Sequence, residues 1–335
     1  MTTFADLETV GGDDPTAAPE AEGSKRKITG KSPTAIAFQR LRHDKMAVFS
    51  ASIVLFLVIL GVFCAQISAA FGVTPADGDS GTLIYLGYPA IGPPFHGFIW
   101  SHPLGINPVT ASDNLAQLLY GIRTSFAISV VATVLSTAIG LVLGLVAGFA
   151  RGWVDRVISF TIDAFLSFPF LLGALALAPI ITTRYAAQPN ALSYASFAAL
   201  VFVLTFFGWM GLARLIRGQV FQLREREYIQ AAQVIGVPTR RILFKELLPN
   251  LIAPLVVSIS LSMPAFVAAE AGLSYLGIGI TGMPSLGQTI AIAVQFAQQY
   301  PLFLWAPVLA VALLVLSLNL LGDSVRDAFD PQTRR

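Results

Sequence analysis

One short charged stretch lies between two long apolar stretches, and it decides how the rest of the chain is interpreted. It reads Glu225-Arg-Glu-Tyr-Ile-Gln-Ala-Ala-Gln-Val-Ile-Gly-Val-Pro-Thr-Arg-Arg-Ile-Leu-Phe-Lys-Glu-Leu-Leu-Pro249. Of the 335 residues, 55% are hydrophobic and only 12% are charged, whereas about a quarter of the residues in soluble globular domains are charged. The chain is therefore predicted to be an all-α integral membrane protein, with this charged stretch outside the bilayer.

Six segments are long and apolar enough to cross a bilayer as helices, for which about 20 residues suffice. They are residues 46–71, 121–150, 155–183, 193–216, 247–272 and 302–323. Soluble cores do not contain so many runs of this length. We therefore expect six transmembrane helices, with residues 121–325 as the membrane core of the protein.

The positions of lysine and arginine predict the orientation of these helices, because basic residues collect on the cytoplasmic side. With the N-terminus inside, all of the 21 basic residues except Arg123 and Arg184 fall in cytoplasmic segments or at their edges. The segment 72–120 contains no lysine or arginine and is expected to be extracytoplasmic. The prediction is a multi-pass protein of the cytoplasmic membrane with both termini inside. The external segment is either a docking surface for another protein or a connection packed on the helices.

Both ends of the chain are polar. Residues 1–33 are predicted to form a disordered cytoplasmic tail, and residues 324–335 a cytoplasmic C-terminal tail. Residues 34–45 fit either a short interfacial helix or an ordinary basic flank. Gly30-Lys-Ser32 lacks the earlier glycine of a phosphate-binding loop, so we expect no ATPase within this chain.

The sequence gives no sign of a metal site, a catalytic site or a nucleic-acid-binding site. The three histidines and Cys64 show no spacing typical of metal ligands, and no catalytic constellation is recognisable. A net charge of +2 gives no reason to expect a nucleic-acid partner. No metal, cofactor or catalytic residue is predicted.

Within the charged stretch, Tyr228, Ala231, Ala232 and Ile235 share one apolar helix face. Gly236 is expected to end this helix, and the sequence around Pro238 to begin another. From the residues alone, two interpretations are equally good: a basic connector, or a compact knob that a soluble partner grips.

The identities of these residues resemble the cytoplasmic loop of integral subunits of ATP-binding-cassette importers. That family's signature is Glu-Ala-Ala, three residues, Gly, nine residues, then Ile, any residue and Leu-Pro. Here Gln230-Ala-Ala232, Gly236 and Leu248-Pro249 stand at the required spacing. Gln230 replaces the first glutamate, and Glu246 replaces the isoleucine.

Four other stretches are similar to the C-type subunit of the dipeptide and oligopeptide permease branch, so that the resemblance covers residues 36–331. They are Phe38-Gln-Arg-Leu-Arg-His-Asp-Lys-Met-Ala, Leu118-Leu-Tyr-Gly-Ile-Arg-Thr-Ser, Glu270-Ala-Gly-Leu-Ser-Tyr-Leu-Gly-Ile-Gly and Asn319-Leu-Leu-Gly-Asp-Ser-Val-Arg-Asp-Ala-Phe-Asp-Pro331.

This resemblance implies a type I importer permease that moves di- or oligopeptides. It implies a heterodimer with a homologous second permease, two cytoplasmic ATPase subunits that bind ATP and Mg²⁺, and an extracytoplasmic substrate-binding protein. Relatives that carry nickel chelates, haem or glycosides leave the substrate open. Residues 225–246 would be the coupling loop. The residues expected to dock an ATPase are Gln230, Ala231, Ala232, Gly236, Val237, Pro238, Arg240, Arg241, Leu248 and Pro249.

Charged residues in or beside the spans are costly and therefore informative. Asp163, Glu270 and Arg123 either line or gate the translocation path or pair locally to hold helices together. Arg123 is a candidate partner for Glu270 or for a peptide carboxylate.

Two other classes of protein compete with this interpretation. An ion-gradient transporter would favour several embedded carboxylates and an internal repeat, whereas this chain shows one or two such carboxylates and no repeat. A channel or assembly factor is a third class, and no sequence like a selectivity filter is present.

Overall fold

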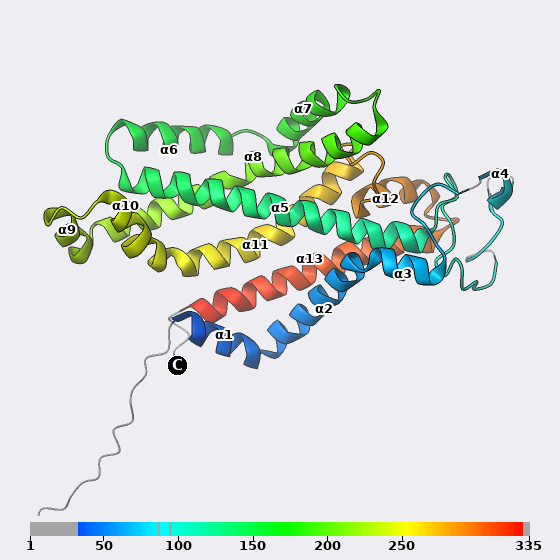
Figure 1. Cartoon of the computed structure of the whole chain (residues 1–335), viewed down its shortest axis with the longest axis horizontal. Coiled ribbons are helices and arrows are strands. Elements are labelled where there is room, and N and C mark those ends of the chain that lie inside the picture. Colours follow the sequence, from blue (N-terminus) through cyan, green and yellow to red (C-terminus); the bar gives the residue numbers. More distant parts are fainter. Residues whose placement is uncertain (1–32, 79, 86–87, 94–95, 331–335) are drawn as a thin grey trace, which may run out of the picture. The chain divides into compact units, whose positions relative to one another are not determined.

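A computed structural model describes residues 33–78, 80–85, 88–93 and 96–330, and the regular elements of this part of the chain are helices apart from one short strand pair (Figure 1). The tail expected over residues 1–33, apart from Pro33, lies outside the described residues, as do residues 331–335. The elements are α1 (Pro33–His43), α2 (Lys45–Val62), α3 (Cys64–Phe71), α4 (Ser80–Leu83), the antiparallel pair β1 (Ile84–Tyr85) and β2 (Tyr88–Pro89), α5 (Asn114–Phe149), α6 (Trp153–Leu166), α7 (Phe170–Thr183), α8 (Pro189–Arg224), α9 (Glu227–Val234), α10 (Thr239–Arg241), the π-helical turn η1 (Ile242–Leu247), α11 (Leu248–Tyr275), α12 (Leu286–Ala293), the 3₁₀ turn η2 (Val294–Phe296) and α13 (Pro301–Phe329).

Within the described residues, five helices are long and apolar enough to span a membrane: α2, α5, α8, the continuous helix Thr239–Tyr275, and α13. A sixth span exists only if α6 and α7, which are bent by 93° at their junction, count as one. Only 22% of the residues of α2 are buried within the chain, so lipid or another subunit must cover the rest of this apolar helix. The fold is therefore an all-helical membrane protein with five or six spans.

The third expected span, residues 155–183, is not one straight helix. α6 ends at Leu166, and Pro169 precedes α7. Proline lacks the N–H that a continuing helix needs and moves the residue before it away from helical geometry. Each half has 14 residues. That is about 21 Å, which is shorter than a hydrocarbon core of about 30 Å.

The first expected span, residues 46–71, is also divided. α2 ends at Val62, Phe63 lies between the helices at φ −93° and ψ 17°, and α3 continues to Phe71. Before α2, Asp44 caps the helix by accepting a hydrogen bond of 2.9 Å from the Met46 N–H. A hydrogen bond from the Ser324 hydroxyl, and then those from the backbone N–H groups, lower the pKa of the Asp44 carboxyl.

α5 and α8 form the most extensive helix pair, and three glycines allow their close approach. Gly140, Gly144 and Gly148 recur every four residues on α5. A Cβ on Gly144 would lie only 2.8 Å from the Ala213 carbonyl oxygen of α8, and one on Gly148 would lie 2.6 Å from the Val220 Cβ. Small residues at this spacing let the backbones of membrane helices approach each other.

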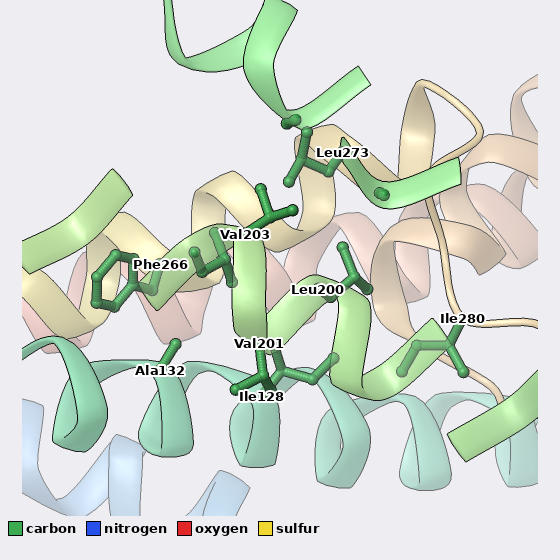
Figure 2. Close-up of a cluster of buried hydrophobic side chains, with 11 residues drawn as sticks. Ile128, Ala132, Leu200, Val201, Val203, Phe266, Leu273 and Ile280 are labelled. Carbon is green, nitrogen blue, oxygen red and sulfur yellow. The ribbon is translucent and has the colours of Figure 1, made fainter. Parts of the chain in front are cut away.

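Apolar side chains fill the space between the central helices, as Figure 2 shows. The cluster joins Ile128 of α5, Val201 of α8 and Phe266 of α11, with Ala174 and Ala178 contributed by α7. Figure 1 also shows that α1, α9, α10 and the C-terminal end of α13 lie toward one end of the bundle, whereas α3 and α4 lie toward the other. The chain therefore has two distinct ends.

Candidate functional site

The charged stretch forms a compact knob, residues 225–249, at one end of the bundle (Figure 1). α8 continues to Arg224, and α9 begins only three residues later, at Glu227. After a four-residue turn, the helix that starts at Thr239 continues through a π-helical turn into α11. The knob is therefore held at both ends by long helices.

The turn inside the knob depends on Gly236. Its φ of 79° lies in the left-handed region, where glycine has no steric penalty. The Gly236 N–H donates to the Gln233 carbonyl at 3.1 Å, and the Val237 N–H donates to the Ala232 carbonyl at 3.0 Å. These two bonds are the Schellman arrangement that closes a helix. Pro238 then precedes the next helix, as the sequence predicts.

One face of the knob packs against the bundle. Ile229, Ile242 and Leu247 are buried in a cluster with Leu145 of α5 and Ile216 of α8. Because this cluster joins residues from α5 to α11, it fixes the knob to the helix bundle, and the knob is not a loose loop.

Four large apolar side chains of the knob are exposed. Val234 is 87% exposed and Ile235 is 78% exposed, at the tip of α9. Phe244 and Tyr228 are also exposed. Of the predicted apolar face, Tyr228 and Ile235 point outward. Exposed large apolar side chains on a knob that also exposes Arg240 are typical of a surface that contacts another protein.

The predicted docking residues all lie on this knob or where it joins α11. Ala232, Val237 and Leu248 are half-buried, and the others are exposed: Gln230, Ala231, Gly236, Pro238, Arg240, Arg241 and Pro249. The Gln230 amide donates to the Glu225 carbonyl at 3.2 Å and so closes the turn between α8 and α9. An ionised glutamate could not donate this bond, which explains why glutamine fits here.

Arg224 was not predicted as a site residue, and it connects the knob to α5. Its side chain is largely buried, and Nη1 donates to the carbonyls of Gly148, Phe149 and Ala150 at 3.3–3.4 Å. These carbonyls belong to the end of α5, where no further helical N–H is available. The guanidinium also lies 4.8 Å from the centre of the Phe221 ring. Its position in the last turn of a long helix was the only signal in the sequence.

Beside Arg224, an open hollow of about 410 Å³ separates the end of α5 from the knob. Arg151 and Arg224 line it, together with Gln233 and Thr239 of the knob. The hollow therefore places two arginines beside the knob, of which Arg224 also pairs with Glu225 at 3.3 Å.

Asp163, a predicted path residue, forms an ion pair with Arg214 of α8 at 2.5 Å. Two helical turns before it on α6, Asp155 makes a bidentate ion pair with Arg217, at 2.7 and 3.1 Å. Both pairs connect α6 to α8. Because the Asp163 carboxylate is 67% exposed, it also remains accessible from outside the chain.

The structure does not bring Arg123 and Glu270 together. Glu270 of α11 is fully buried and accepts a hydrogen bond of 2.8 Å from the Ser274 hydroxyl. Arg123 is exposed, and its Nη1 lies 3.9 Å from the Cys64 sulfur. No ion pair joins the two side chains within the ranges that the structure describes. The pairing considered from the sequence is therefore wrong for this conformation.

Two titratable groups outside the knob, His102 and Asp113, pair with each other. His102 lies 2.8 Å from the carboxylate of Asp113, whose other oxygen caps α5 by accepting from the Ala116 N–H. Across the described ranges, no group of three or more His, Cys, Asp or Glu side chains is placed to hold a metal ion.

Known families and curated relatives match this chain over most of its length. The family described as "Binding-protein-dependent transport system inner membrane component" matches residues 140–335, more than half of the chain. The "N-terminal TM domain of oligopeptide transport permease C" matches residues 32–81. The oligopeptide transport system permease protein OppC of Mycobacterium tuberculosis is 37% identical over 235 residues, which are 70% of this chain and 77% of that protein.

Two further relatives cover more of the chain. The dipeptide transport system permease protein DppC of Alkalihalophilus pseudofirmus is 28% identical over 95% of this chain and 96% of its own length. The glutathione transport system permease protein GsiD of Shigella dysenteriae is 28% identical over 89% of this chain and 90% of its own.

A solved structure supports the fold. A chain of the MetNI methionine ABC transporter in an inward facing conformation aligns with a TM-score of 0.52 and 20% identity, over 64% of this chain and 96% of that chain. The family match and the mycobacterial relative together decide the family. The chain belongs to the binding-protein-dependent transport system inner membrane components, as a non-catalytic, multi-pass permease subunit of an ABC importer.

Proposed function

We propose that this chain is one of two homologous permeases in an ATP-driven importer of di- or oligopeptides, and that an ATPase subunit docks on the knob. The relatives named above support the substrate class, because their names refer to oligopeptides, dipeptides and glutathione. The further partners are a second ATPase subunit, an extracytoplasmic binding protein and the surrounding lipid. ATP is bound by the ATPase subunits.

The observation that carries the proposal is the apolar tip. Val234 and Ile235 are held outward on a knob whose other face is fixed to the bundle. A permease that uses the energy of ATP needs a contact surface through which movement of an ATPase is transmitted. The proposed orientation places the knob, α1 and the end of α13 in the cytoplasm, where the ATPases lie, and places the opposite end outside.

The helix that follows the knob provides a route by which movement of the docking surface would reach the membrane-spanning helices. Residues Thr239–Tyr275 form one helix of 37 residues, which is about 55 Å long. It starts beside the docking surface and ends next to Glu270. Because the π-helical turn over Ile242–Leu247 lies near its start, we expect bending to concentrate there. Movement of the knob would therefore tilt α11 against α5 and α8.

The test uses the complete complex, with both permeases, the ATPases and the binding protein, in proteoliposomes. We expect the double variant Val234→Asp/Ile235→Asp to lose at least about tenfold of both peptide uptake and peptide-stimulated ATP hydrolysis. Gly236→Trp and deletion of residues 229–244 should have the same effect. Gln222→Asp, which adds charge to the exposed side of α8, serves as the control and should retain activity.

Two results would contradict the proposal. Wild-type coupling in the double variant would show that the tip is not the docking surface. Peptide uptake that continues without any ATPase subunit would show that the protein is driven by an ion gradient instead.

A further inference from the structure

At the end opposite the knob, a hollow of about 560 Å³ opens between α5, α8 and the loop after α11. Arg123 and Thr124 of α5, Tyr194 and Phe197 of α8, and Met283 of the loop line it. It combines one guanidinium with hydroxyl groups and apolar walls. Its volume lies in the range of small-molecule sites, about 300–1,000 Å³.

The loop that forms one wall is held in a fixed position. Gly282 adopts a φ of 77°, and a Cβ at this position would press against the Ser193 hydroxyl of α8. The Thr281 N–H donates to the Ser196 hydroxyl at 3.2 Å, and Ile280 is completely buried. The hollow is therefore a preformed feature of the fold.

Arg123 occupies a favourable depth for binding an anion. α5 has 36 residues, about 54 Å, so it extends about 12 Å beyond a hydrocarbon core of about 30 Å at each end if it is centred. Arg123 lies about 14 Å from the start of this helix, at the edge of that core. Here a positive charge remains accessible to water, while the apolar walls strengthen its attraction for a negative one.

The guanidinium has no acidic partner within the described residues. Among the described residues its one hydrogen-bond contact is the weak one to the Cys64 sulfur at 3.9 Å. A guanidinium carries five N–H donors in a planar arrangement that matches the two oxygens of a carboxylate.

We infer that this hollow receives the C-terminal carboxylate of an incoming peptide, which Arg123 binds while Phe197 and Met283 contact the terminal side chain. The inference rests on the proposed function and names the substrate group that is recognised. The phosphate of a lipid headgroup is also an anion and would be attracted to Arg123 in the same way. A peptide fits better, because the hollow extends from the charge to the aromatic rings of Tyr194 and Phe197.

The experiment compares one peptide with its C-terminal amide in the reconstituted complex, at concentrations that saturate the binding protein with either form. We expect Arg123→Gln to lower uptake of the free acid about tenfold and uptake of the amide less than about twofold. Arg123→Lys keeps the charge and should retain part of the preference. Arg184→Gln, at the exposed end of α7, is the matched control and should change neither rate.

Each other outcome decides against the inference. Equal losses for acid and amide in an assembled Arg123→Gln complex would show a structural role only. Unchanged peptide uptake that becomes sensitive to anionic lipid in the vesicles would assign Arg123 to a phosphate headgroup. If the wild-type complex imports neither peptide, the proposed function itself fails, which distinguishes that result from failure of the pocket assignment alone.

Discussion

At the scale of single residues, Arg224 and Gly236 determine where the knob is held and how it turns. Gly236 was predictable, because a glycine followed two residues later by a proline is a strong signal for the end of one helix and the start of the next. Arg224 was not, because in the sequence it is one basic residue in a basic flank. Its three carbonyl partners lie 74 to 76 residues earlier in the chain, and no local pattern reveals such a contact.

Replacement of Arg224 by methionine should destabilise the protein, because three carbonyls at the end of α5 would lose their donor. We expect a loss of about 1–3 kcal/mol in the free energy of unfolding, the range for a buried acceptor left without its donor. The measurement is thermal unfolding of the detergent-solubilised protein. Arg226→Met, two residues away and exposed, is the control. Equal shifts for both variants would contradict the role given to Arg224.

Replacement of Gly236 by alanine tests the left-handed turn. Open space surrounds this position, so the cost comes from the backbone alone, and we expect about 1 kcal/mol. Gly218→Ala is a matched control, because it also has open space but lies inside α8, where alanine favours the helix. The two variants should therefore change the unfolding temperature in opposite directions. A stabilised Gly236→Ala protein would rule out the strained turn.

At the scale of helices, the sequence predicted which segments are apolar better than where each helix bends. Length and composition identified the regions of α2, α5, α8, α11 and α13. The break at Pro169 was missed, because residues 157–183 carry a single charge and are long enough for one span, and proline occurs inside membrane helices. α12 was not predicted either, since glycine, proline and glutamine interrupt residues 271–322 and leave only a short apolar run.

The contact between α5 and α8 yields a prediction for this pair of helices. Gly144→Ala would place a methyl group 2.8 Å from the Ala213 carbonyl oxygen, so the helices would have to separate. We expect a loss of about 1–3 kcal/mol, typical of overpacking. Gly211→Ala on α8 adds the same methyl group into open space and should be neutral or slightly stabilising. Unfolding temperatures of the two variants provide the comparison, and a neutral Gly144→Ala would contradict the close packing.

At the scale of the whole molecule, the two ends have different tasks in the proposed importer. The knob presents an apolar tip at one end, and the Arg123 hollow opens at the other. The continuous helix Thr239–Tyr275 connects the knob to the far side of the core. Sequence reasoning identified the knob, because its signature is local. It could not determine whether Arg123 meets Glu270, because that depends on how α5 and α11 rotate against each other.

The most direct measurement of the central claim is site-specific cross-linking from the knob. Cys64 is the one cysteine of the sequence, so Cys64→Ser provides a form of this chain without thiols. Ile235→Cys in this form is labelled with a photoactivatable maleimide before the chain is assembled with its partners, and Gln222→Cys on α8 is the control. We expect a cross-link from position 235 to an ATPase subunit, with much less from position 222. No link from position 235, in a complex that still hydrolyses ATP in response to peptide, would contradict it.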